Sequence, residues 1–162
     1  MNLYIRQKVF SIGDKFDVYD FYGKTLYTVK GEVLTVGKKF HIFDSSGTEI
    51  AYIHQKVLSF KPRYFISRAN IDIAQVVKEI TFFKPVYTVP EFGWNIEGDF
   101  FNHNYLITSG NLNIASIRKA WVSWGDTYEV SVDSSADVIN ALCVVLIIDA
   151  VTAAQNNSGS YH

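Results

Sequence analysis

Along most of the chain, apolar and polar residues alternate with a period of two, and the alternation recurs in similar blocks of about 14 residues. Each block opens on an apolar residue, passes a central turn signal of Gly, Lys, Pro, Asp or Asn, and closes on an aromatic, a variable and an aliphatic residue. Such alternation around a turn signal is typical of a β-hairpin with one buried face. Six blocks begin at Ile5, Val29, Ile53, Val76, Trp94 and Ile117.

The closing aromatic and aliphatic residues of each block lie two positions apart, so both side chains point to the same face of the sheet. We expect that face to be the core. The pairs are Phe16 and Val18, Phe40 and Ile42, Tyr64 and Ile66, Tyr87 and Val89, Tyr105 and Ile107, and Tyr128 and Val130.

Turns and irregularities divide the repeat further. The links between blocks carry Gly23, Gly47 and Gly110, which supply the positive φ of tight turns. The link from Val89 to Trp94 is about five residues shorter than the others and contains Pro90, so we expect a seam there. The alternation falters at three places, which predicts bulges that curve the sheet. These are Gln7-Lys8, Gly31-Glu32 and Gln55-Lys56.

A helix is predicted over Ser134 to Gln155, where the period of two stops. Ser134 and Asp137 have the spacing of a capping box, and an acid in the first turn suits the helix dipole. The run from Ala141 to Ile148 is apolar on every side, so this helix is buried either in protein or in lipid.

Burial in protein is favoured over a membrane span. A span needs about 20 mostly apolar residues, and this segment contains Asn140, Asp149 and Thr152 and has no flanking Lys or Arg. Side chains alone fill a barrel of about eight strands. Six hairpins give about twelve strands, which leaves room for a helix about 10–12 Å across. We therefore predict a mainly β fold: a closed antiparallel barrel that encloses the C-terminal helix.

Length and composition indicate one domain over residues 1–155, followed by a polar tail, 156–162, that we expect to be disordered. The formal charge of -1 argues against general nucleic-acid binding. The single cysteine, Cys143, lies in the apolar helix and is interpreted as a small core residue. The first ten residues lack the pattern of a signal peptide, so we expect a cytoplasmic protein.

No catalytic or metal-binding motif stands out. The histidines His41, His54, His103 and His162 lack metal-ligand spacing, and we expect them to be solvated or hydrogen-bonded. Oxygen-bearing residues from Asp133 to Asp137 begin like a calcium loop, but Val138 and Val144 stand where such a loop has its glycine and its last acid. Helix capping explains them better. We predict no enzymatic activity, no metal and no cofactor.

Three stretches resemble the LURP-one-related family of the tubby C-terminal-like superfamily, which also contains the phospholipid scramblases. They are the hairpin segments IRQKVFSIG and DSSGTEIAYIHQKVLSF and the helix that ends in Ile148-Asp149. The resemblance implies a twelve-stranded barrel around a hydrophobic C-terminal helix. It implies little about activity: tubby-type domains bind phosphoinositides and scramblases act on phospholipids, but no lipid-binding motif maps onto this chain residue by residue.

In a barrel of successive hairpins, the tips inside the blocks lie at one end and the links between blocks lie at the other. The sequence predicts that their charges differ. The tips carry Lys15, Lys38, Lys39, Lys61, Arg63 and Lys84 against Asp14 and Asp126. The links carry Asp20, Asp44, Glu49, Asp72, Glu91 and Asp133 against Lys24 and Arg68.

Two functional hypotheses follow. In the first, the six basic tip residues dock on anionic phospholipid headgroups, and the protein is peripheral at the inner face of a membrane. In the second, the outward aromatic residues Tyr19, Phe43 and Phe65 bind a protein partner. The chain would enter the barrel at the links, so the helix would point its C-terminus at the tips. We therefore predict that Asp149 meets Lys or Arg of the tips and lies away from Asp20 and Asp44.

Overall fold

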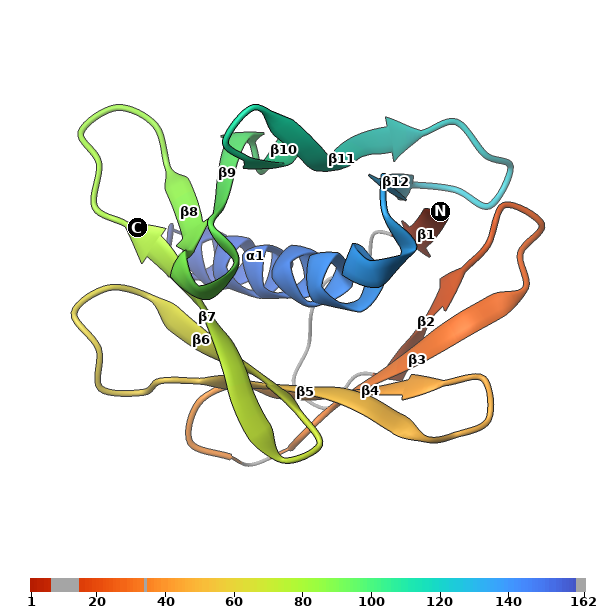
Figure 1. Cartoon of the computed structure of the whole chain (residues 1–162), viewed down its shortest axis with the longest axis horizontal. Coiled ribbons are helices and arrows are strands. Elements are labelled where there is room, and N and C mark those ends of the chain that lie inside the picture. The colour runs from red at the N-terminus through yellow and green to blue at the C-terminus, as the bar shows by residue number, and fades with distance from the viewer. Residues whose placement is uncertain (7–14, 34, 160–162) are drawn as a thin grey trace.

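The computed structural model describes residues 1–6, 15–33 and 35–159. Within these residues the chain forms a closed antiparallel barrel of twelve strands, with one α-helix inside it (Figure 1). The strands are β1 (Asn2–Arg6), β2 (Lys15–Tyr19), β3 (Thr25–Gly31), β4 (Lys39–Asp44), β5 (Glu49–Gln55), β6 (Arg63–Arg68), β7 (Ile71–Glu79), β8 (Val86–Val89), β9 (Trp94–Asp99), β10 (Asn104–Ser109), β11 (Leu112–Ala120) and β12 (Thr127–Val132).

Each strand pairs with its neighbours in sequence, and β1 closes the ring on β12, where Leu3 lies opposite Val130. The N-terminal ammonium group donates a hydrogen bond of 2.8 Å to the carbonyl of Val132, which ties the first residue to the end of the last strand. The predicted fold class is confirmed.

The repeating aromatic-x-aliphatic positions face the barrel interior. Eleven of these twelve side chains belong to the buried core, and the twelfth, Phe16, is half-buried against it. Tyrosine takes the aromatic position in the last four hairpins, and its large ring contributes much of the buried apolar surface there. The hairpin repeat therefore supplies the inner wall.

The helix begins after a short 3₁₀ turn, η2 (Ser135–Asp137), and α1 runs from Val138 to Gly159. The Ser134 hydroxyl accepts a hydrogen bond of 3.3 Å from the Ala136 amide, so the predicted N-cap is confirmed. Every residue from Ala141 to Val151 is buried. Among the described residues this helix has the length and composition to cross a membrane, but 67% of its most apolar window is buried inside the barrel.

The C-terminal end of α1 extends past the predicted limit at Gln155, because residues 156–159 continue the helix as exposed polar residues. The other residues of the expected tail, 160–162, lie outside the described part of the chain. Burial raises the pKa of the Cys143 thiol to about 12, in keeping with the predicted core role.

Two of the three predicted bulge positions are wrong. Gly31 and Gln55 are the last residues of β3 and β5, so the faltering alternation marks where these strands end. Gln7-Lys8 lies outside the described residues. The register shifts instead follow the inward aliphatic residue near the links, at Val18/Tyr19, Ile42/Phe43, Ile66/Ser67 and Ile107/Thr108.

The predicted seam is also closed. β8 pairs with β9 through Val89 opposite Trp94. The short link is a single 3₁₀ turn, η1 (Pro90–Phe92), and Gly93 ends it with a φ of 64°. A left-handed residue reverses the chain at once, so five fewer residues suffice to bring the next strand into register.

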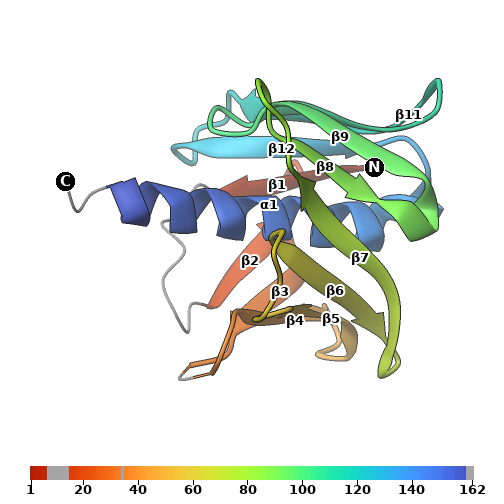
Figure 2. The same cartoon turned by 90° about the vertical axis from the view of Figure 1, so that its left-hand side faces the viewer.

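The barrel has two different ends. We call the loops inside the hairpins the tip rim and the turns between hairpins the link rim. The chain enters the barrel from β12 at the link rim, and α1 runs toward the tip rim, where its C-terminal end projects beyond the strands (Figure 2).

Candidate functional site

At the tip rim, the Asp149 carboxylate closes the mouth of the barrel and is 7% exposed. Its Oδ1 lies 3.1 Å from Nε2 of His103, and its Oδ2 accepts a hydrogen bond from the Tyr128 hydroxyl. The imidazole stacks on the Tyr128 ring, with centroids 4.0 Å apart. Burial, followed by the nearby Asp149 carboxylate, raises the pKa of Tyr128 well above the usual range, so this hydroxyl stays protonated and donates.

The predicted threading of the helix is confirmed, but the predicted partner of Asp149 is wrong. His103 lies in the tip between β9 and β10, so Asp149 is at the tip rim. A lysine does reach this end of the helix: Lys38 Nζ donates a hydrogen bond of 3.2 Å to the carbonyl of Ala150. The backbone is therefore the acceptor for the tip lysine, while histidine and tyrosine meet the carboxylate.

The six predicted basic residues differ in what they contact. Lys38 already donates a hydrogen bond to the helix backbone, and burial lowers its pKa. Lys39 lies 3.9 Å from Glu32, and Lys61 lies 2.5 Å from Glu79. Arg63 donates to Gln75, whereas Lys15 and Lys84 are exposed. The sequence prediction did not count Glu32 and Glu79, and the predicted Asp14 lies outside the described residues.

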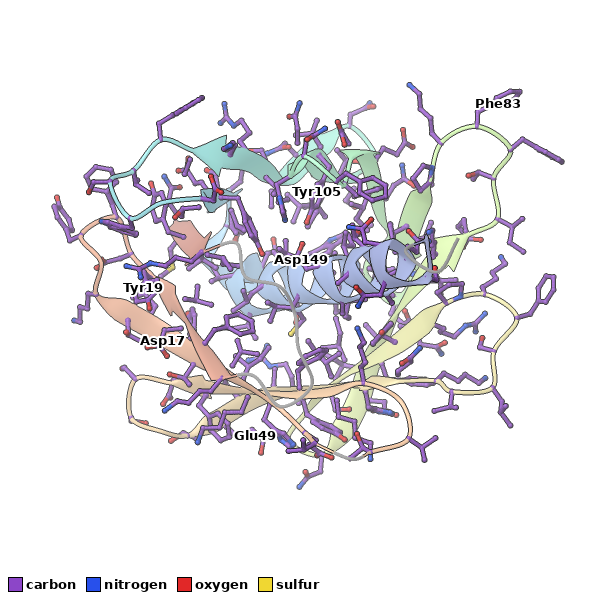
Figure 3. All side chains as sticks on the ribbon, turned by 180° about the vertical axis from the view of Figure 1, so that it is seen from behind. Asp17, Tyr19, Glu49, Phe83, Tyr105 and Asp149 are labelled. Carbon is purple, nitrogen blue, oxygen red and sulfur yellow. The ribbon has the colours of Figure 1, made fainter. Side chains whose placement is uncertain are left out.

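The tip rim also carries apolar side chains that the sequence analysis missed. Five of them, which we call the apolar tips, are between 92% and 100% exposed: Leu58, Phe60, Phe82, Phe83 and Trp121. In Figure 3, Phe83 stands at the far end of its loop and points away from the barrel, whereas Asp149 lies at the helix. Large apolar residues beside a turn signal could have indicated these exposed side chains. The periodicity of the hairpins alone does not show at which residue each strand ends.

Four of the apolar tips lie on two loops that leave adjacent strands. Leu58 and Phe60 are in the loop between β5 and β6, and Phe82 and Phe83 are in the loop between β7 and β8. The two loops are neighbours, because β6 pairs with β7 and the Lys78 amide donates to the Pro62 carbonyl at 2.9 Å. Exposed apolar side chains on neighbouring loops are typical of an interaction site.

The predicted outward aromatic residues are half-buried and lie in ring clusters. Tyr19 packs edge-on against Trp124, with centroids 6.0 Å apart. Phe43 stacks with His41, and Phe65 stacks with His54. These two histidines also contact carboxylates, so His41, His54 and His103 are hydrogen-bonded as expected, while His162 lies outside the described residues. Among the described residues, no three His, Cys, Asp or Glu side chains converge as a metal site requires.

The fold places the protein among closed antiparallel barrels that are built around a C-terminal helix. An Arabidopsis thaliana protein of known X-ray structure has a similar fold, with a TM-score of 0.63 and 17% sequence identity over 93% of this chain and 90% of that protein. At this identity the likeness shows the fold alone.

The family is defined by sequence as well. The LURP-one-related family model matches residues 1–149, and the chain belongs to that family. The chain is also 32% identical over 151 residues to the uncharacterized protein YxjI of Bacillus subtilis (strain 168), a match that covers 93% of each chain.

Proposed function

We propose that this protein docks by its tip rim on anionic phospholipid membranes, as a non-enzymatic peripheral module. The observation that carries the proposal is that four apolar tips on two loops from adjacent strands extend almost fully exposed from one end of the barrel: Leu58, Phe60, Phe82 and Phe83. Burying such a side chain contributes about 1.5–3 kcal/mol when it leaves water completely. Even partial insertion of four side chains is enough for measurable membrane binding.

The charges nearest these loops support the same orientation. Lys56 and Lys84 flank the two loops, are exposed, and make no ion pair within the described part of the chain. A basic residue close to an anionic leaflet contributes about 1 kcal/mol. Lys39 and Lys61 already have carboxylate partners, so the apolar tips and the unpaired lysines carry the proposed contact together.

Cosedimentation with phosphatidylserine-containing vesicles over a salt series tests the proposal. The wild-type protein should bind, and rising salt should weaken but not abolish binding, because apolar insertion is not screened. The double variant Phe82→Ser/Phe83→Ser should bind at least about tenfold more weakly, since each ring contributes more than about 1.4 kcal/mol.

The matched control is Ile71→Ser/Leu112→Ser, which removes two side chains that are 66% and 69% exposed at the link rim. It should bind vesicles like the wild type. Wild-type protein that stays in the supernatant at low salt contradicts the proposal, and so does an equal loss of binding in both double variants.

A further inference from the structure

Five stacked rings cross the outer wall of β4, β5 and β6, and we call them the ring ladder: Phe43, His41, Tyr52, His54 and Phe65. Tyr52 is the central ring, with His41 at 4.7 Å on one side and His54 at 5.4 Å on the other. Phe43 and Phe65 end the ladder.

Beside the ring ladder lies an open groove with a volume of about 570 Å³. Its lining includes His41, Tyr52 and His54 from the ladder, with Ala69 and Asn70 in the turn between β6 and β7. The described residues that line it include three carboxylates, Glu32, Glu49 and Asp72, and no lysine or arginine. Figure 3 shows Glu49 on the outside of the barrel, away from Phe83.

Glu32 already has cationic partners. His41 lies between two carboxylates, with Nε2 2.7 Å from Glu32 and Nδ1 2.7 Å from Glu49. Only the imidazolium form donates from both nitrogens. Burial alone would lower the pKa of His41, but the hydrogen bonds that it donates to Glu49 and Glu32, with the charges of these carboxylates, outweigh burial and raise the pKa. Lys39 approaches the other oxygen of Glu32 at 3.9 Å.

Glu49 and Asp72 each keep an oxygen for a ligand. Asp72 Oδ1 accepts from the Ser67 hydroxyl and lies 3.0 Å from His54 Nε2. Within the described residues, Asp72 Oδ2 and Glu49 Oε2 have no hydrogen-bond partner. Burial is the main cause that raises the pKa of Tyr52, and the negative charges of Glu32, Glu49 and Asp72 raise it further. Glu49 and Asp72 therefore both lie near the Tyr52 ring.

We infer that this groove binds an arginine side chain in a basic segment of a partner protein. A guanidinium group is planar, donates several hydrogen bonds to carboxylate oxygens and packs against aromatic rings. The groove offers one free oxygen each from Glu49 and Asp72, beside the rings of the ladder. Glu49 begins β5 and Asp72 is the second residue of β7, so both carboxylates lie at the link-rim end of the groove. The groove stays accessible when the tip rim rests on a membrane, and the inference does not depend on membrane docking.

Nuclear magnetic resonance titration of the full chain tests this inference. The probe is a short capped peptide with one arginine between glycine and serine residues, and a matched peptide carries lysine instead. The arginine peptide should shift the amide signals of Tyr52, His54 and Asn70 most. The variant Glu49→Gln/Asp72→Asn should bind it at least about tenfold more weakly, because two charge-assisted hydrogen bonds are lost.

Asp126→Asn/Asp133→Asn is the charge-matched control, since it removes two negative charges outside the groove and should bind like the wild type. Three results would overturn the inference. The first is a set of shifts spread over all acidic turns, the second is equal binding by the groove variant, and the third is stronger binding of the lysine peptide or of spermidine, which would assign the groove to amines. Vesicle binding should be unchanged in the groove variant, so a failure here is distinct from a failure of membrane docking.

Discussion

The chain reverses direction at both ends of the barrel, but the residues that form the turns differ between the link rim and the tip rim. At the link rim, aspartate side chains satisfy the turns internally: Asp20 Oδ1 accepts from the amides of Tyr22 and Lys24, and Asp44 Oδ1 accepts from those of Ser46 and Thr48. At the tip rim, longer loops expose Leu58, Phe60, Phe82 and Phe83. Folding explains the polar turns, but it does not explain the apolar tips.

This difference also appears along the helix. At the link rim the helix starts from a Ser134 cap that is exposed, whereas at the tip rim it leaves the barrel past the nearly buried contacts of Asp149. The tip end therefore has two features: the contacts of Asp149 with His103 and Tyr128, which we call the polar seal, and the exposed apolar tips. A partner can bind the apolar tips without any change in the buried core.

The largest expected effect comes from breaking the helix that joins the two ends. Val145→Asp places a carboxylate at a position that is 0% exposed, with apolar residues on all sides. An unpaired buried charge costs several kcal/mol, against a typical total stability of about 5–15 kcal/mol. We expect no cooperative unfolding transition by circular dichroism, whereas Val145→Ala should still fold. A cooperatively folded Val145→Asp protein would refute the enclosed helix.

The charges of the two rims are compared directly by charge reversal. Lys56→Glu/Lys84→Glu should reduce binding to anionic vesicles by at least about tenfold, because two attractions of about 1 kcal/mol each become repulsions. Lys24→Glu/Arg68→Glu makes the same change in charge at the link rim and should leave binding unchanged. Flotation of both variants measures the difference, and equal behaviour would remove the distinction between the rims.

At the mouth of the barrel, Asp149→Ala removes the acceptor of the buried Tyr128 hydroxyl and the partner of His103. Leaving a buried donor unsatisfied costs about 1–3 kcal/mol, which urea unfolding would detect. Asp149→Asn keeps an acceptor oxygen and should lose less. If alanine at this position were neutral, the polar seal would have no role in stability.

At the opposite end of the helix, Ser134→Ala should cost about 1 kcal/mol, since only one exposed capping bond is lost. Ser134→Asp restores a capping oxygen and serves as the control. Urea unfolding of the two alanine variants then ranks the helix ends, and a larger loss at Ser134 than at Asp149 would reverse the order proposed above.

The smallest effect is a pH dependence at the outer wall. The pKa of His41 is raised in the folded state above 6.5, so its contribution to stability is complete below that pH and is lost as pH rises through the higher folded value. Relative to His41→Gln, the wild type should lose stability over that window. Thermal melts from pH 5 to 9 measure this, and parallel curves for the two proteins would exclude it.

Much of the fold follows from local sequence pattern. The period of two placed Tyr105 and Ile107 inward, and the absence of any polar side from Ala141 to Ile148 required an enclosed helix. These inferences hold because the direction of a side chain depends only on its position along its own strand or helix. The order of hairpins and the direction of threading followed from chain connectivity in the same way.

Contacts between strands depended on the tertiary structure. His103 reaches Asp149 across 46 residues, and the groove combines Glu49 of β5 with Asp72 of β7. Which side chains meet in this way depends on the register shifts near the links, and a misplaced bulge moves every neighbour by one residue. The sequence did not predict the exposure of Phe82 and Phe83 for a related reason. Only the pairing of the strands shows that β7 ends at Glu79, so that the two rings lie beyond the sheet.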